Sequence, residues 1–138
     1  MSIQESNVNR MRFFVEQVQE RGRLELIEGL VRPEFRNRTV EPGQLDDRAG
    51  IGETVAAMHE AFSDLRIEIL HCVGDGEFVA THKLFRARHT GPWFGRQPSG
   101  NPVEFRVMDL VRYRDGQWDE HWAVADAISL LRQTGALS

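Results

Sequence analysis

The stretch Val103–Gly135, VEFRVMDLVRYRDGQWDEHWAVADAISLLRQTG, predicts two strands joined by a tight turn and followed by a short helix. Asp115-Gly116 marks the turn, because a primed two-residue hairpin needs positive φ, which these residues tolerate. Before the turn, a period of two places one mostly apolar set of side chains on a single, inward face. That set contains one acid, and its members are Val103, Phe105, Val107, Asp109, Val111 and Tyr113.

After the turn, the same alternation predicts a second inward set, formed by Trp118, Glu120, Trp122, Val124 and, if the strand extends so far, Asp126. It directs His121 the other way, toward the outer surface of the sheet or a dimer interface. A carboxylate in an apolar wall is costly unless it is hydrogen-bonded or protonated. The acids among these apolar residues therefore predict a pocket with acid–base chemistry.

The composition indicates one domain, 1–138, with an apolar core. The chain has 138 residues, of which 41% are hydrophobic, and a net charge of -4. This acidic balance argues against a nucleic-acid partner. Its one cysteine, Cys72, excludes an internal disulfide. No apolar run approaches the roughly 20 residues of a membrane span, and the start lacks the apolar region of a signal peptide, so we expect a soluble cytoplasmic protein.

Helical and strand patterns are segregated along the chain. Apolar periodicity predicts helices over 7–20, 24–30 and 49–62, with Asn7 capping the first, Pro33 ending the second and a loop over 34–50. Strands over 66–73 and 77–89 follow, then a loop over 90–102 suited to a lid or rim, the hairpin, and a helix over 127–134. Four antiparallel strands set apart from helices indicate an α+β fold. We expect a cone-shaped barrel whose N-terminal helices pack on a strongly curved antiparallel sheet, with a ligand site at its mouth.

Two groups of residues resemble those of a known family, the SnoaL-like polyketide cyclases. His89-Thr90-Gly91-Pro92-Trp93-Phe94-Gly95, followed by Pro98-Ser99-Gly100, resembles the family's Gly-rich loop. Glu104-Phe105-Arg106, Asp115-Gly116, Glu120-His121-Trp122, Asp126 and Leu130-Leu131-Arg132-Gln133 resemble its C-terminal signature. The resemblance implies the cone-shaped α+β barrel that nuclear transport factor and ketosteroid isomerase relatives share.

The resemblance also implies an activity. Such cyclases close a ring by intramolecular aldol condensation without a cofactor, using an Asp as acid/base, a His, and aromatic residues that hold a flat substrate. This chemistry needs a base that removes a proton α to a carbonyl, and a donor for the enolate oxygen. We therefore expect an apolar, carbonyl-rich substrate, no cofactor, no metal and, as is common in the wider fold, a homodimer.

Several residues are candidates for this site, and Glu120 equally suits a pair with an Arg on a neighbouring strand. Asp126 is the first choice for the acid/base, although it also suits the N-cap of the last helix, and Asp109 is the second. His82 is a pocket candidate or a satisfied core residue, and His121 a less direct catalytic candidate. Expected substrate-binding residues are Trp122, Glu120, Phe105, His89, Trp93, Phe14 and Met58. The histidine spacings match no metal signature.

Two other functions remain open. An epoxide hydrolase of this fold would need an Arg with paired Asp residues, for which Arg106, Asp109 and Asp126 are the available set. Alternatively, the cone binds a small apolar ligand without catalysis, or only dimerises.

Overall fold

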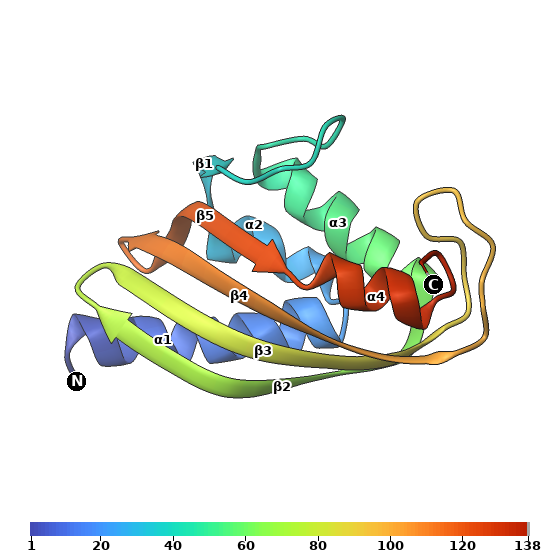
Figure 1. Cartoon of the computed structure of the whole chain (residues 1–138). Helices are drawn as coiled ribbons and strands as arrows, with labels where there is room; N and C mark the ends of the chain where they lie inside the picture. Colours follow the sequence, from blue (N-terminus) through green and yellow to red (C-terminus); the bar gives the residue numbers. More distant parts are fainter. Residues whose placement is uncertain (138) are drawn as a thin grey trace.

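The computed structural model describes residues 1–137 and consists of one curved sheet with helices packed on its concave face (Figure 1). The helical segments are α1 (Ile3–Phe14), the π-helical η1 (Val15–Glu20), the 3-10 turn η2 (Leu24–Leu26), α2 (Ile27–Leu30), α3 (Arg48–Ala61) and α4 (Ala127–Gln133). The strands are β1 (Val31–Asn37), β2 (Phe62–Asp75), β3 (Phe78–His89), β4 (Pro102–Arg114) and β5 (Gln117–Ala125). The predicted α+β class is confirmed, and the open, curved sheet agrees with the predicted cone.

The sheet contains a strand that the sequence pattern did not predict. Its order is β1-β5-β4-β3-β2, with β2 to β5 antiparallel and β1 parallel to β5. We expected Pro33 to end a helix and a loop to follow, but Pro33 lies within β1, and Val31 and Phe35 are fully buried. Proline is tolerated there because β1 is an edge strand, in which an N–H can remain outside the ladder.

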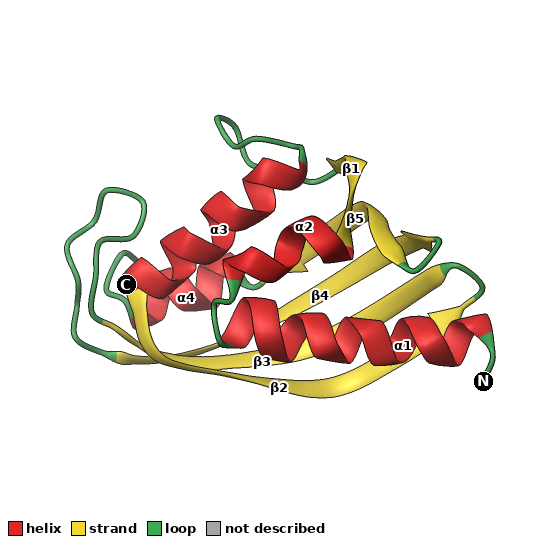
Figure 2. Ribbon diagram, turned by 180° about the vertical axis from the view of Figure 1, so that it is seen from behind, coloured by secondary structure: helices red, strands yellow, loops and turns green. Residues whose placement is uncertain are grey.

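The first helix also begins earlier than predicted. Ser2 caps α1, since its Oγ accepts a hydrogen bond from the Glu5 backbone N–H at 3.1 Å. Asn7, the predicted cap, is a buried residue inside the helix. Figure 2 shows α1 lying along β2 and β3 on the concave side, with α2 and α3 beside it. None of the helices in residues 1–137 is long and apolar enough to cross a membrane.

Two apolar clusters fill the concave side. The cluster beneath α1 contains Met11, Phe14, Val15, Val18, Val31, Phe35, Val79, Val111, Tyr113 and Trp118. The cluster toward the Gly-rich loop contains Ala61, Phe62, Leu65, Phe85, Val103, Phe105 and Leu130. The members of these clusters on β3, β4 and β5 therefore mark the inward face of each strand.

The Gly-rich loop joins β3 to β4 and is fastened to the end of α3. The backbone N–H groups of Thr90 and Gly91 both donate to the Ala61 carbonyl, at 3.0 Å each. A Cβ at Gly91 would collide with the Glu60 carbonyl oxygen, so only glycine allows this approach. Trp93 packs toward Phe62, with ring centroids 6.1 Å apart.

Replacing Gly91 with Ala should therefore destabilise the protein by about 1–3 kcal/mol, because backbone rather than a flexible side chain must move. Gly29→Ala is the matched control, since nothing lies within 4 Å of its Cβ position, in α2. That change should be neutral or stabilising by up to about 1 kcal/mol. Urea unfolding of both variants measures the difference, and equal midpoints would contradict the close approach.

Candidate active site

A bulge in β5 decides which of its side chains enter the cone. Tyr113 pairs with Trp118 whereas Arg112 pairs with Glu120, so Asp119 is an extra residue in β5. The alternation changes phase there, and His121 lies across from Val111 on the inward face. The prediction that His121 points outward was therefore wrong.

A polar cluster lies on the inward face where β3, β4 and β5 run side by side. The Lys83 ammonium donates to Asp109 Oδ2 at 2.7 Å and to Gln19 Oε1 at 3.0 Å. The Nε2 atom of His121 lies 3.5 Å from the same Asp109 Oδ2. The exposed fractions of the side chains are 2% for Lys83, 1% for Asp109 and 15% for His121. Of these three side chains, only that of His121 has an exposed edge, while its Nε2 atom beside Asp109 is buried.

The charges of this cluster are set by burial and by close partners. Burial alone would raise the pKa of Asp109, but the Lys83 ammonium, and then His121, outweigh it and hold the pKa below its ordinary value. Asp109 is therefore ionised at neutral pH. Its Oδ1 atom is buried and has no hydrogen-bond partner in residues 1–137, so one acceptor of the carboxylate remains unused.

Aromatic rings surround the histidine. Trp118 stacks on His121 with ring centroids 5.2 Å apart, and on Phe14 at 4.0 Å. The Trp118 Nε1–H donates to the Tyr113 hydroxyl at 3.1 Å. Burial raises the pKa of Tyr113 well above its usual range, so the hydroxyl stays protonated. These contacts fix the plane of the His121 ring.

Several predicted site residues lie on the outer face of the sheet instead. The β5 bulge turns Glu120 and Trp122 outward, where Glu120 pairs with Arg38 at 2.9 Å and Trp122 packs toward Phe78 at 6.4 Å. His82 also faces outward, because β3 pairs regularly with β4 and places Lys83 inward. The predicted shared inward face of Trp118, Glu120 and Trp122 and the pocket position of His82 were therefore wrong.

A second bulge, in β2 between Ile69 and His71, shifts the alternation of that strand by one residue. It brings His71 to the outer face beside His82, with their Nδ1 atoms 3.2 Å apart. Arg106 Nη1 lies 3.3 Å from His82 Nε2 on the same face.

The first-choice acid, Asp126, is exposed and caps α4. Its Oδ1 accepts a hydrogen bond from the Ser129 backbone N–H at 3.1 Å. Arg106 lies on the outer face, so the structure does not bring Arg106, Asp109 and Asp126 together as the epoxide hydrolase arrangement requires.

The remaining predicted contact residues line the two cores. Phe14 is buried beneath Trp118, whereas Phe105 is buried in the cluster near the Gly-rich loop, and Met58 and Trp93 pack against that cluster. His89 is buried, and its Nδ1 accepts a hydrogen bond from the Ser99 backbone N–H at 3.0 Å. His89 thus fixes the conformation of the Gly-rich loop.

The sequence analysis missed Lys83 and Gln19. With a period of two along β3, Lys83 shares a face with Val79, Thr81 and Phe85, which was a visible signal of an inward lysine. That face could not be assigned without knowing the register. Gln19 has no such signal, because it reaches Lys83 from η1 across 64 positions of sequence.

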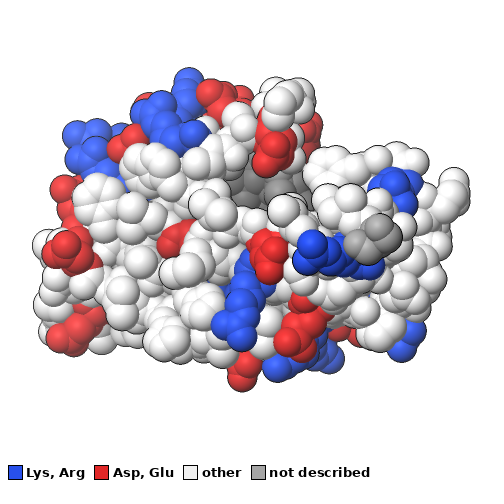
Figure 3. Space-filling model, viewed as in Figure 1, with Lys and Arg blue, Asp and Glu red and all other residues white. Residues whose placement is uncertain are grey.

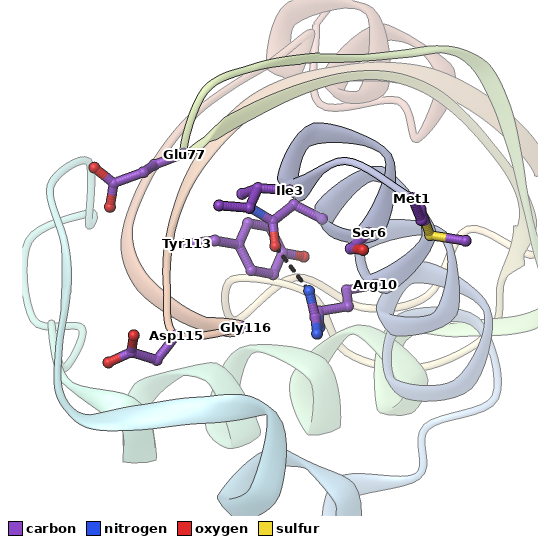
Figure 4. Close-up of a pocket in the computed structure, with 9 residues that line it drawn as sticks. Met1, Ile3, Ser6, Arg10, Glu77, Tyr113, Asp115 and Gly116 are labelled. Atoms are coloured by element: carbon purple, nitrogen blue, oxygen red, sulfur yellow. Dashed lines mark hydrogen bonds between the residues drawn. The ribbon is translucent and has the colours of Figure 1, made fainter.

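The described part of the chain has several surface hollows. Figure 3 shows a depression between the segment that joins β1 to α3 and the end of β5, the strand that carries His121. Elsewhere, a cavity of about 400 Å³ is lined by Met1, Ile3, Ser6, Asn7, Arg10, Glu77, Tyr113, Asp115 and Gly116. In Figure 4, Arg10 lies near the Tyr113 ring while Glu77 and Asp115 point away from it. Neither Asp109 nor His121 lines this cavity.

In residues 1–137 no group of three or more His, Cys, Asp or Glu side chains is placed to hold a metal ion.

A mutant cycle tests the buried pair. Lys83→Met or Asp109→Leu alone should cost about 3–5 kcal/mol of unfolding free energy, because each leaves a buried charge without its partner. The double variant should equal the wild type or exceed its stability by up to about 4 kcal/mol, because a well-packed apolar pair carries no desolvation penalty. Chemical unfolding of the four proteins measures the coupling, and additive single effects would contradict a direct interaction.

The same variants give a pH signature. The lowered pKa of Asp109 means that its stabilising contribution is complete above the unfolded value of about 3.9 and is lost as pH falls below it. The wild type should therefore lose stability relative to the double variant as the pH is lowered through about 4. A difference between the two proteins that does not change with pH would count against an ionised Asp109.

Comparison with known proteins places the chain in a family. The family model described as SnoaL-like polyketide cyclase matches residues 9–134. A search of curated proteins found no match. TsrD from Streptomyces laurentii is 23% identical, with a TM-score of 0.88 over 99% of this chain and 100% of that one, which supports the fold alone.

Two further structures are somewhat more similar in sequence. IdmH from Streptomyces antibioticus, a candidate polyketide cyclase, is 26% identical with a TM-score of 0.80, covering 94% of this chain and 98% of that one. AclR from Streptomyces galilaeus, a candidate hydroxylase, is 25% identical with a TM-score of 0.79, covering 94% and 87%. Because the family model spans nearly the whole sequence, the chain belongs to the SnoaL-like polyketide cyclase family.

Proposed function

We propose that the protein is a cofactor-independent cyclase or isomerase that acts on an apolar, carbonyl-rich small molecule through the Asp109–His121 pair. The observation that carries this proposal is the 3.5 Å approach of His121 Nε2 to Asp109 Oδ2 within an aromatic wall. An ionised carboxylate beside an imidazole is a common acid–base arrangement.

The two residues have different roles in this proposal. His121 is the member with an exposed edge, so it is the group that meets the substrate. It removes a proton α to a carbonyl, and the resulting enolate carbon attacks a second carbonyl of the same molecule. The new carbon–carbon bond leaves an alkoxide, which takes the proton back from the imidazolium. Asp109 lies against the imidazole and holds the ring in place, and is therefore a positioning residue.

The buried side of His121 is aromatic. Trp118 and Phe14 stack in series behind its ring, and Phe35 lies 6.2 Å from Trp118. These rings are buried, so they keep water from that side of the imidazole during proton transfer. Non-catalytic ligand binding would use the same exposed edge of His121, and the activity variants below separate the two.

Proton abstraction can be tested without the natural substrate, by following deuterium exchange at the α-carbon of a 1,3-diketone by NMR. His121→Asn should lower the enzyme-dependent rate by about 10²–10⁴-fold, the usual contribution of a general base. Asp109→Asn should lower it less, with little change in KM, since Asp109 does not touch the substrate.

His71→Asn, on the outer face, is the control for loss of a histidine and should exchange at the wild-type rate. Asp126→Asn separates the proposal from the first sequence-based choice. Loss of exchange in Asp126→Asn with retention in His121→Asn would overturn the proposal, and exchange in no protein would favour a binding function.

We also propose that a second copy of the chain covers the outer face of the sheet. Four apolar side chains are exposed there, namely Val73, Phe78, Met108 and Val124. Two ion pairs flank them, Arg86 with Glu104 on one side and Arg112 with Glu120 on the other. A two-fold axis through this patch would set Arg against Glu and cover the apolar stripe.

Val124→Asp should therefore convert a dimer to a monomer, measured by light scattering during size-exclusion chromatography, because it buries a charge at the centre of the interface. Leu45→Asp changes an exposed apolar residue outside the patch and should leave the mass unchanged. A monomeric wild type at micromolar concentration would contradict this interface.

A further inference from the structure

Lys83 and His121 approach the same oxygen of Asp109. The Lys83 Nζ lies 2.7 Å and the His121 Nε2 3.5 Å from Oδ2. The carboxylate therefore has one cation in close contact before the imidazole acquires any charge. This competition for one oxygen has a consequence for the protonation of His121.

The ammonium cannot leave this position easily. Only 2% of the Lys83 side chain is exposed, and Gln19 Oε1 accepts its second hydrogen bond at 3.0 Å. Its Nζ also lies 5.6 Å from the centroid of the Phe85 ring. The positive charge is thus held in place by β3, by η1 and by the apolar core, rather than being free to turn toward solvent.

The electrostatic effect on His121 has a clear sign. A lone buried carboxylate at 3.5 Å would favour the imidazolium, and the histidine would then hold its proton and be unable to act as a base. A fixed positive charge on the same oxygen opposes that attraction. The distances are short and the site is buried, so neither effect is screened as it would be in water.

Other ionisable groups around the ring do not alter this balance. Burial raises the pKa of the Cys72 thiol on β2 and of the Tyr113 hydroxyl on β4, so both are neutral. Along β5 and its neighbour β1, Asp119 is paired with Arg32 at 3.0 Å, and Glu120 is paired with Arg38 and Arg112. The charge that His121 experiences is therefore that of Asp109 and Lys83 together.

We propose that Lys83 is a positioning residue that keeps His121 neutral, and hence available as a base, by neutralising Asp109. The catalytic meaning of this role rests on the proposed function above. The protonation of His121 does not, because it can be measured in the folded protein with no substrate present.

Histidine titrations followed by NMR test the proposal, with the His121 signal assigned by its absence in His121→Asn. In Lys83→Met the midpoint of that signal should move to higher pH by about one unit or more, equivalent to a tenfold change in proton affinity. Lys83→Arg, which keeps the charge, should stay close to the wild type. The signals of His59, His71, His82 and His89 serve as internal references.

Asp109→Asn provides a second variant of opposite sign. It leaves Lys83 charged and removes the carboxylate, so the His121 midpoint should move to lower pH. An unchanged or lowered midpoint in Lys83→Met, or a raised one in Asp109→Asn, would overturn the proposal. If Lys83→Met does not fold, Lys83→Gln replaces it as the neutral variant, and its His121 midpoint should also move to higher pH.

The exchange assay then separates the two proposals. If both hold, the acid limb of the pH–rate profile moves in Lys83→Met with the NMR midpoint, and kcat at neutral pH falls while KM is unchanged. If the midpoints move as expected but no protein catalyses exchange, the charge-setting role of Lys83 stands and the proposed function fails. If exchange depends on His121 but the midpoints do not move, the proposed function is supported and the role of Lys83 is wrong.

Discussion

The interaction on which the interior depends is the buried ion pair between Lys83 and Asp109. Two charges removed from water are tolerated only when they lie close together and their remaining hydrogen-bonding atoms are satisfied. Here the 2.7 Å contact and the Gln19 amide meet most of that requirement, while Asp109 Oδ1 remains without a partner in residues 1–137. The pair ties η1, β3 and β4 together at one point, and it gives a mostly apolar wall a single ionised carboxylate. Any chemistry on this wall must begin from that charge.

Bulges in the sheet determine which residues share the wall with this pair. Asp119 in β5 shifts the alternation by one residue, which brings His121 to Asp109 and sends Glu120 and Trp122 outward. The bulge between Ile69 and His71 in β2 does the reverse, and moves a histidine from the inner face to the outer one. Because the side-chain period of a strand is two, one extra residue exchanges every later side chain between the faces. These bulges thus determine both which residues meet Asp109 and which residues are exposed on the outer face.

The family match accounts for the architecture, while the polar cluster follows from the contacts of Lys83, Asp109 and His121. The match over residues 9–134 and the similar structures establish the cone of helices on a curved sheet. The Gly-rich loop, which carried much of the resemblance, serves the fold through Gly91 at the end of α3 and through His89, which binds Ser99. The arrangement around Asp109 depends instead on three strand positions and one glutamine. A fold shared by many proteins leaves such positions free to vary, and for this reason fold and chemistry must be argued separately.

The sequence by itself determined the α+β class, the Asp115-Gly116 hairpin, the inward position of Asp109 and the capping role open to Asp126, because each depends on local periodicity or turn chemistry. Tertiary structure alone decided the edge strand β1 with its internal proline, the outward turn of His82, Glu120 and Trp122, and the meeting of Lys83, Gln19 and His121 with Asp109. The physical reason is that alternation identifies residues that share a face but does not say which face is buried. Strand pairing, bulges and contacts across 64 residues of sequence settle that question, and none of them leaves a local trace in the chain.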